Sequence, residues 1–306
     1  MDGILPLWKP AGMTSHDSVF KIRKILRTKK VGHTGTLDPQ VEGVLPICIG
    51  QATKISSLVM DSNKVYEAEV CLGISTETED QDGQIVESRV VEGNLSIEQI
   101  ETALKSYTGE IEQMPPMYSA VKVNGKKLYE YAREGISVER PKRLVMIHST
   151  QLLSDKIEWS KDQDTASFRI RINCSKGTYI RTLCVDIGKA LGYPAHMAHL
   201  VRTESGSFTR EQTMTLDEVK EAQEQNKIQE NLIPIDFALQ KFDTLYINEK
   251  DSFRYQNGQV LPLPNPLPST NPFRVKTKND QLLALYQIHP TKGTLMKPFK
   301  MFAKEK

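Results

Sequence analysis

A carboxylate held in a glycine-rich loop is the strongest candidate for chemistry in this sequence. Asp38 lies in the segment Gly32-His33-Thr34-Gly35-Thr36-Leu37-Asp38-Pro39. Because proline disfavours the helical region for the residue before it, we expect the backbone of Asp38 to be extended. The glycines permit backbone angles that are closed to other residues. A carboxylate aimed in this way can act as a nucleophile. An ordinary turn with a solvated aspartate is the alternative that these residues alone leave open.

Three histidines suggest other kinds of chemistry. His33 lies between the two glycines of the loop, and its planar ring could stack in RNA in the place of a displaced base. His196 and His199 have a spacing that can ligate a metal ion. The sequence places no third histidine, cysteine or acidic ligand convincingly beside them. We therefore expect both to be structural, and we expect no metal.

Local signals predict the elements around the loop. Thr14 and Asp17 form a capping box that opens a helix, and Ser96 with Gln99 opens a second helix in the same way. The apolar residues 44–49 predict a buried strand directly after the loop, which itself shows no periodic pattern over residues 31–42. Asn124-Gly125 predicts a type I′ turn.

Two further segments position the remaining candidates. Residues 64–73 alternate between apolar and polar, which predicts a strand with Tyr66 on its apolar face. Residues 166–174 alternate in the same way, and a helix follows over residues 179–192. This order places Arg181 in the first turn of that helix.

The overall composition does not announce a nucleic-acid partner. The 306 residues include 40 lysines and arginines against 38 acidic residues, a net charge of +2. Basic residues gather in residues 21–30 and 165–185, which contain no acid, whereas acids gather in residues 77–92. Such segregation could form a face that follows a phosphate backbone, although charge-biased helix faces also arise by chance. The candidates for phosphate contacts are Lys9, Lys21, Arg23, Lys24, Lys122 and Arg202.

Cysteine usage and the N-terminus indicate a cytoplasmic protein. The four cysteines form no C-x-x-C pair and lie in apolar stretches, which is typical of reduced, buried thiols. The first residues lack a basic segment followed by an apolar one, and no run approaches the roughly 18 apolar residues of a membrane span. We expect no disulfide, no zinc and no membrane partner. The cysteines are Cys48, Cys71, Cys174 and Cys184.

The loop and four other stretches resemble one family. Residues 31–45 resemble the catalytic motif of the TruB-type tRNA pseudouridine-55 synthases. The resemblance covers about residues 3–210 and implies the α+β pseudouridine synthase fold, a mixed, largely antiparallel sheet with flanking helices and an RNA-binding cleft. It implies a catalytic domain over residues 1–240 and, more loosely, a small β-rich, PUA-like domain over residues 241–306. The other matching stretches, in the family's order, are residues 8–15, 64–68, 115–122 and 175–182.

The same resemblance implies a reaction and roles for individual residues. It implies that uridine-55 in the T-loop of tRNA is flipped out of its stack and isomerised to pseudouridine without a cofactor. Asp38 would be the nucleophile, Arg181 its ionic partner, and Tyr66 the residue that stacks on the base and offers its hydroxyl to the C5 proton. The residues leave open whether the carboxylate attacks the base or assists its departure from the sugar. Contacts to the substrate are implied for His33, Tyr179 and Leu200, and we add Lys9 as a phosphate contact.

The resemblance also bears on partners. Residues 118–125 and the short N-terminus look like the stand-alone bacterial form rather than the guide-RNA-dependent relatives. We therefore expect tRNA as the partner, no guide RNA or obligate protein partner, and a monomer. The main alternative is a non-catalytic tRNA-binding or folding chaperone in which Asp38 is structural. A metal hydrolase that uses His196 and His199 is a third hypothesis.

Overall fold

A sheet of ten strands forms the body of the molecule. The computed structural model describes residues 1–162 and 164–302. In spatial order the strands of the main path are β1 (Gly3–Lys9), β3 (Glu42–Ile49), β13 (Ala195–Ser205), β4 (Lys64–Leu72), β12 (Ala166–Cys174), β10 (Arg143–Leu152) and β7 (Gly109–Gln113). Beside this path, β2 (Val31–His33) pairs with β3, β11 (Glu158–Trp159) with β12, and β14 (Phe208–Thr209) with β13. The described pairs are antiparallel except that of β13 with β3.

Helices pack against the sheet and confirm the α+β class. Two of them begin with the capping boxes predicted at Thr14 and Ser96. A third ends at Gly192, which adopts the left-handed conformation that commonly terminates helices. The helices are α1 (Ser15–Ile25), α2 (Ser56–Met60), α3 (Ile97–Ser106), α4 (Leu128–Arg133), α5 (Ile180–Leu191), α6 (Leu216–Glu224) and α7 (Ser252–Gln256). Short 3₁₀ helices cover Gly50–Ile55, Arg210–Gln212, Ile228–Asn231, Ile235–Leu239 and Glu249–Asp251.

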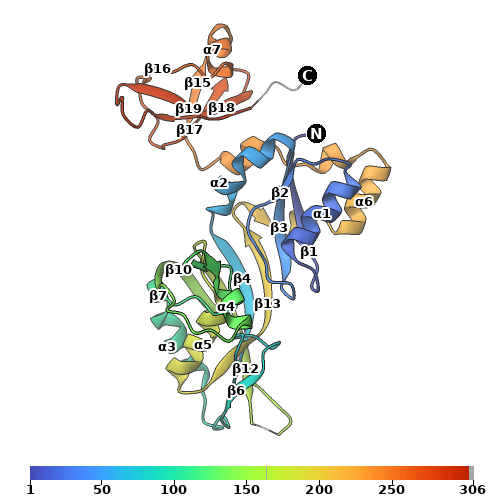
Figure 1. Cartoon of the computed structure of the whole chain (residues 1–306), viewed down its shortest axis with the longest axis vertical. Helices are drawn as coiled ribbons and strands as arrows, with labels where there is room; N and C mark the ends of the chain where they lie inside the picture. The colour runs from blue at the N-terminus through green and yellow to red at the C-terminus, as the bar shows by residue number, and fades with distance from the viewer. Residues whose placement is uncertain (163, 303–306) are drawn as a thin grey trace.

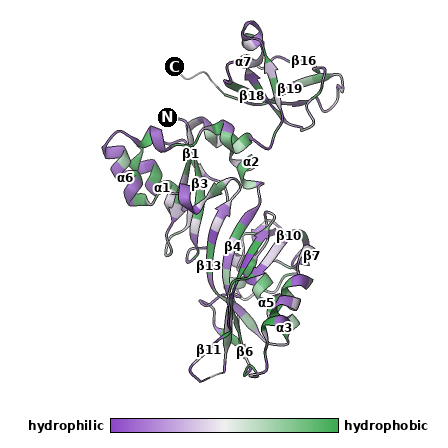
Figure 2. Cartoon of the chain, turned by 180° about the vertical axis from the view of Figure 1, so that it is seen from behind, coloured by the Kyte–Doolittle hydropathy of each residue, from purple (hydrophilic) through white to green (hydrophobic). Residues whose placement is uncertain are grey.

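The long strands β4 and β13 connect two parts of the molecule. In Figure 1 they run from the part that carries α1 and α6 to the part that carries α3 and α5. Hydrophobic and hydrophilic residues alternate along them, as Figure 2 shows. Ala68, Val70 and Leu72 of β4 are buried, which confirms the predicted strand and its apolar face. The centre of the sheet thus has one face in the core and one that carries polar side chains.

Strand β13 touches both halves of the sheet. It pairs with β4 along its length and with β3 at Val201 and Arg202. Two bulges interrupt the pairing with β4, one between Met197 and His199 and one after Arg202. At the crossing with β3 the backbones approach closely, because a Cβ on Gly43 would lie 2.2 Å from the backbone oxygen of Arg202. Only glycine, here with a φ of +127°, fits there.

A second sheet occupies the C-terminal part of the chain, as Figure 1 shows at the end away from α3. In spatial order its strands are β15 (Thr244–Ile247), β17 (Phe273–Thr277), β18 (Leu282–Ile288), β19 (Leu295–Met301) and β16 (Leu261–Pro262). Asp236, which precedes this sheet, forms ion pairs with Arg274 and with the buried Lys276 of β17. The domain division at residue 240 stays a prediction, and its last residues, 303–306, lie outside the described part.

Two hairpins complete the described structure. One pairs β5 (Ile74–Thr76) with β6 (Ile85–Ser88), and the other pairs β8 (Lys122–Val123) with β9 (Lys126–Lys127). Asn124 and Gly125 close the second hairpin, both with positive φ, which confirms the predicted type I′ turn.

Two sequence-based expectations were wrong in detail. Residues 31–42 were expected to be entirely loop, but Val31–His33 forms β2 because the neighbouring β3 supplies a hydrogen-bonding edge. Cys71 was expected to be buried but is partly exposed, because it lies on the polar face of β4. The other three thiols are buried and free, as predicted. In the described ranges, 1–162 and 164–302, no helix is both long and apolar enough to cross a membrane.

Candidate active site

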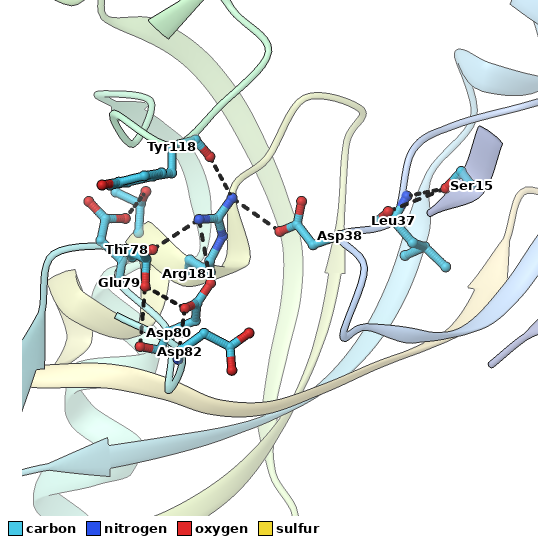
Figure 3. Close-up of polar contacts among 10 residues, drawn as sticks. Ser15, Leu37, Asp38, Thr78, Glu79, Asp80, Asp82, Tyr118 and Arg181 are labelled. Atoms are coloured by element: carbon cyan, nitrogen blue, oxygen red, sulfur yellow. Dashed lines mark hydrogen bonds and ion pairs between the residues drawn. The ribbon is translucent and has the colours of Figure 1, made fainter. Parts of the chain in front are cut away.

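The loop that carries Asp38 is tied to the core on both sides of the aspartate. On one side, the Ser15 hydroxyl accepts a hydrogen bond from the backbone N–H of Leu37 at 2.9 Å. On the other side, the carbonyl of Pro39 accepts hydrogen bonds from Lys9 Nζ at 3.1 Å and from the N–H of Gly12 at 3.0 Å. Leu37 itself is buried. The backbone is therefore fixed where the carboxylate emerges, and Figure 3 shows the contact between Ser15 and Leu37 beside Asp38.

Arg181 is the ionic partner of Asp38. Its Nη2 lies 3.1 Å from Asp38 Oδ2 and donates at 3.0 Å to the carbonyl of Tyr118, and its Nη1 donates at 2.9 Å to the carbonyl of Thr78. Nη1 also lies 3.6 Å from Asp80 Oδ2. Figure 3 shows the guanidinium between these groups. Arg181 occupies the first turn of α5, where the helix dipole disfavours a cation, and the two carboxylates offset that disadvantage.

The loop between β5 and β6 supplies the second carboxylate. Asp80 Oδ1 accepts hydrogen bonds from the hydroxyl of Thr78 and from the N–H of Asp82, which aims Oδ2 at Arg181. The neighbouring Glu79 accepts a hydrogen bond from Thr182 in α5 at 2.6 Å. Burial raises the pKa of Glu79 above its ordinary value, although this hydrogen bond and nearby arginines oppose the shift. This acidic loop, residues 77–84, thus contacts the first turn of α5.

Two cavities meet at the ion pair. The larger, of about 600 Å³, has a size suited to a flipped nucleoside. Its wall includes Asp38, Arg181 and three of the residues expected in the site, Tyr66, Tyr179 and Leu200. The smaller, of about 290 Å³, lies on the side of the acidic loop and shares Asp38, Arg181 and Leu200 with the first.

Tyr66 and Tyr179 are positioned by different means. Tyr66 projects from β4 opposite Arg202 of β13. Burial raises the pKa of Tyr66 above its ordinary value, while the positive charge of Arg202 acts in the opposite direction. Tyr179 precedes α5, and the side chain of Gln113 bonds to both its N–H and its carbonyl, each at 3.0 Å. The backbone of Tyr179 is therefore fixed at the wall of the cavity.

The contacts of Lys9 correct our expectation of a phosphate contact. Lys9 has no exposed surface, and its Nζ donates to the carbonyls of Pro10, Met13 and Pro39 at 2.8, 2.6 and 3.1 Å. Its three donors are used within the protein, so this lysine positions the Asp38 loop rather than meeting RNA. Arg202, another phosphate candidate, is only 1% exposed. The sequence analysis assumed that both cations face solvent, and no local pattern indicated that they are buried.

The histidines take separate places. His33 ends β2, and its Nδ1 accepts a long hydrogen bond of 3.4 Å from the N–H of Gly35. It lines neither of the two cavities described above. His196 is buried with Nδ1 2.8 Å from the carbonyl of Ile74, whereas His199 is exposed. Among residues 1–162 and 164–302, no group of three His, Cys, Asp or Glu side chains is arranged to hold a metal ion.

Sequence reasoning missed several residues that build the site. Asp80 lay in an acidic stretch with no local feature to distinguish it from its neighbours. Gln113 gave no signal either, since the backbone of Tyr179 that it holds is distant in the chain. Tyr118 contributes its backbone carbonyl, which no side-chain pattern can indicate. Only the matching stretch at residues 115–122 hinted that this segment belongs to the site.

Comparisons with known proteins identify the family of this chain. Residues 23–180 match the N-terminal domain of the TruB family of pseudouridylate synthases, and residues 181–240 match the C-terminal domain of tRNA pseudouridylate synthase B. Two similar relatives carry the name tRNA pseudouridine synthase B. The protein from Bacillus pumilus is 51% identical and that from Oceanobacillus iheyensis 54%, and each match covers 100% of this chain and 99% of the relative.

Two solved structures with a similar fold are those of protein complexes. The chain in the crystal structure of an archaeal box H/ACA sRNP Nop10–Cbf5 complex is 25% identical with a TM-score of 0.71, over 98% of this chain and 86% of that one. A chain in a Cbf5–Nop10–Gar1 complex is 26% identical with a TM-score of 0.70, over 99% and 84%.

Proposed function

Because the chain belongs to the TruB family of pseudouridylate synthases, we propose that it converts uridine-55 in the T-loop of tRNA to pseudouridine with Asp38 as the nucleophile. Formation of pseudouridine in tRNA is its activity. The observation that supports the role of Asp38 is the ion pair with Arg181 at the wall of a cavity that could receive a flipped nucleoside. The pair holds the carboxylate in place through Oδ2, and the second oxygen takes no part in it.

The reaction can be written with these groups. The bond between uracil N1 and ribose C1′ breaks, the detached base turns within the cavity, and its C5 bonds to C1′. C5 then loses its proton and N1 gains one, so the product is an isomer of the substrate. No electrons are gained or lost overall. A carboxylate serves either by attacking the base or by assisting its departure from the sugar. The reaction as written needs no cofactor.

We assign Tyr66 to stacking against the flipped base, with Tyr179 and Leu200 completing the wall. Because burial raises its pKa, the Tyr66 hydroxyl is protonated in the free protein at neutral pH. Taking the C5 proton would thus be a second role that depends on the bound substrate. His33 lies outside the cavity, which suits the role of filling the gap that the base leaves in the RNA.

The remaining parts of the proposal concern partners and place. We infer that the T-arm is bound without a guide RNA, as expected of the stand-alone bacterial form, and that the chain acts as a monomer in the cytoplasm, where tRNA is modified.

Asp38→Asn tests the proposal. The substitution keeps the shape of the side chain and removes the nucleophile, so pseudouridine in a tRNA transcript should fall below detection while unfolding temperature and RNA affinity stay near those of the unmodified chain. Asp217→Asn, at an exposed position of α6, serves as the control and should retain full activity. Mass spectrometry of nuclease fragments locates the product. Undiminished turnover by Asp38→Asn would exclude the nucleophile, and a purified protein that only refolds tRNA would support the chaperone.

A further inference from the structure

Arg202 is a buried guanidinium that lines the larger cavity. It is 1% exposed and belongs to the largest fully buried side chains of the described structure. Its Nε donates to the carbonyl of Val44 at 2.8 Å, which fixes the plane of the group. Its Nη2 is buried and has no hydrogen-bond partner among the described residues. An unused donor of a charged group in this setting is unusual, because leaving such a group unsatisfied carries the full cost of its desolvation.

Two other buried cations near the cavity make the contrast clear. Lys9 uses its three donors on backbone carbonyls. Lys64 donates to the carbonyls of Met60 and Ser62. Burial, reinforced by the charge of Arg202, lowers the pKa of each lysine to about 8. Of these three cations, Arg202 alone keeps a buried nitrogen without an acceptor.

No carboxylate neutralises Arg202 within the described residues. None lies within 4.0 Å of its nitrogens, whereas Asp38 and Asp80 are both engaged by Arg181. A buried cation without a counter-ion destabilises the folded state, because its desolvation is not offset. Tyr66 is its neighbour across the strands, and the two side chains share the same cavity. Arg202 therefore brings a localised positive charge and an unpaired donor to the wall of the cavity.

We propose that Arg202 is a catalytic residue that binds an exocyclic oxygen of the target uracil through Nη2 and takes up the negative charge that the base gains when its N1–C1′ bond breaks. When that bond breaks, its electron pair stays on the uracil ring and spreads over N1 and the exocyclic oxygens. The charge disappears again when C5 bonds to C1′ and the C5 proton is lost, with a proton returning to N1. A fixed cation at such an oxygen stabilises the anionic intermediate more than the starting nucleoside.

The inference rests on the proposed function. A first measurement on the unmodified chain distinguishes failure of the inference from failure of the proposed function. RNAs that carry 2-thiouridine or 4-thiouridine at the target position have sulfur in the place of one exocyclic oxygen. Sulfur is a weak hydrogen-bond acceptor. One of the two should react roughly tenfold more slowly than uridine in single turnovers, because a charged hydrogen bond is weakened. If both sulfur substrates react at the rate of uridine, the proposal for Arg202 is wrong. If uridine itself gives no pseudouridine, the proposed function fails instead.

A second measurement uses Arg202→Lys, which keeps the charge but cannot place a donor at the position of Nη2. It should slow the uridine substrate by roughly 100-fold, the range seen when one donor to a developing anion is removed. A 5-fluorouridine substrate should be slowed much less, because fluorine stabilises the detached base as an anion and less help is needed. Fluorine replaces the hydrogen on C5, so the earlier steps can occur but the final loss of a proton cannot. The readout is therefore the disappearance of the target nucleoside. Equal slowing of both substrates would overturn the proposal.

A purely indirect effect through Tyr66 predicts a different pattern. In that case Arg202→Lys would have no effect in a Tyr66→Phe background, whereas direct contact with the base predicts that the slowing persists there. Lys276→Met removes a buried cation of the C-terminal sheet. It controls for loss of stability and should leave the single-turnover rate unchanged. Unfolding temperatures of all variants are measured alongside.

Discussion

Arg181 and Asp38 form an ion pair in which one partner is buried and the other is not. The arginine side chain is 7% exposed and the aspartate side chain 46%, although their charged atoms are 3.1 Å apart. The guanidinium is held by the carbonyls of Thr78 and Tyr118 and does not depend on Asp38 for its position. Asp38 therefore receives a fixed positive charge on one oxygen while it stays accessible from the cavity.

Arg181→Lys tests whether this geometry matters beyond its charge. A lysine has a single ammonium and cannot reach both carbonyls and both carboxylates together. We expect the single-turnover rate to fall by roughly 100-fold, with RNA affinity changed little. The control is Arg171→Lys in the half-exposed pair with Glu204, which should change the rate less than twofold. A fully active Arg181→Lys would show that charge alone suffices.

Lys9→Met should damage the Asp38 loop and not the RNA contact. It leaves the carbonyls of Pro10 and Met13 without their donor, so we expect a stability loss of about 1–3 kcal/mol for each of the two that water does not reach. The carbonyl of Pro39 keeps its hydrogen bond from the N–H of Gly12. Because Lys9 has no exposed surface, the dependence of RNA binding on salt should keep its slope. Loss of a phosphate contact would instead reduce that slope by about one. Lys220→Met, at an exposed position of α6, is the matched control.

Gly43→Ala should strongly destabilise the fold. The new methyl group would lie 2.2 Å from the backbone oxygen of Arg202, and the residue would keep an unfavourable positive φ. The strands β3 and β13 would have to separate, so we expect a loss of about 3 kcal/mol or more in urea unfolding. Gly93→Ala places its methyl group in open space and should stay within about 0.5 kcal/mol. Equal stability of the two variants would show that the crossing can relax.

Lys64 should give stability an unusual dependence on pH. Burial lowers its pKa from 10.5 to about 8 in the folded protein, so the folded state loses this proton first as pH rises. Below pH 8 the protonated, buried Lys64 destabilises the folded state by its full amount. Between pH 8 and 10.5 this destabilisation is relieved, and the free energy of unfolding rises by at most about 1.4 kcal/mol per pH unit. Lys64→Met lacks this contribution. The stability of the unmodified chain relative to Lys64→Met should rise over that range in urea titrations, and a constant difference would contradict the assignment.

The features that local sequence predicted are those that local contacts determine. The helix at Thr14 and Asp17 and the turn at Asn124 depend on neighbours within a few residues, and the structure confirms them. The burial of Lys9 and Arg202 depends on strands and loops that are distant in the chain, so composition indicated the wrong environment for both. Asp80 could not be distinguished until α5 brought Arg181 beside it. The candidate site was found through family resemblance, which carries the long-range information that local patterns lack.

Strand β13 makes the site sensitive to changes in chain length. Leu200 and Arg202 lie two residues apart on β13 and both line the larger cavity. Because side chains alternate along a strand, inserting one residue just before Leu200 would turn both toward the opposite face unless the preceding bulge absorbed it. Insertions in the turn at Asn124 would move no cavity-lining side chain of β13. We therefore expect insertions and deletions to be tolerated in the hairpins of this enzyme. We expect them to be rare between residues 199 and 203.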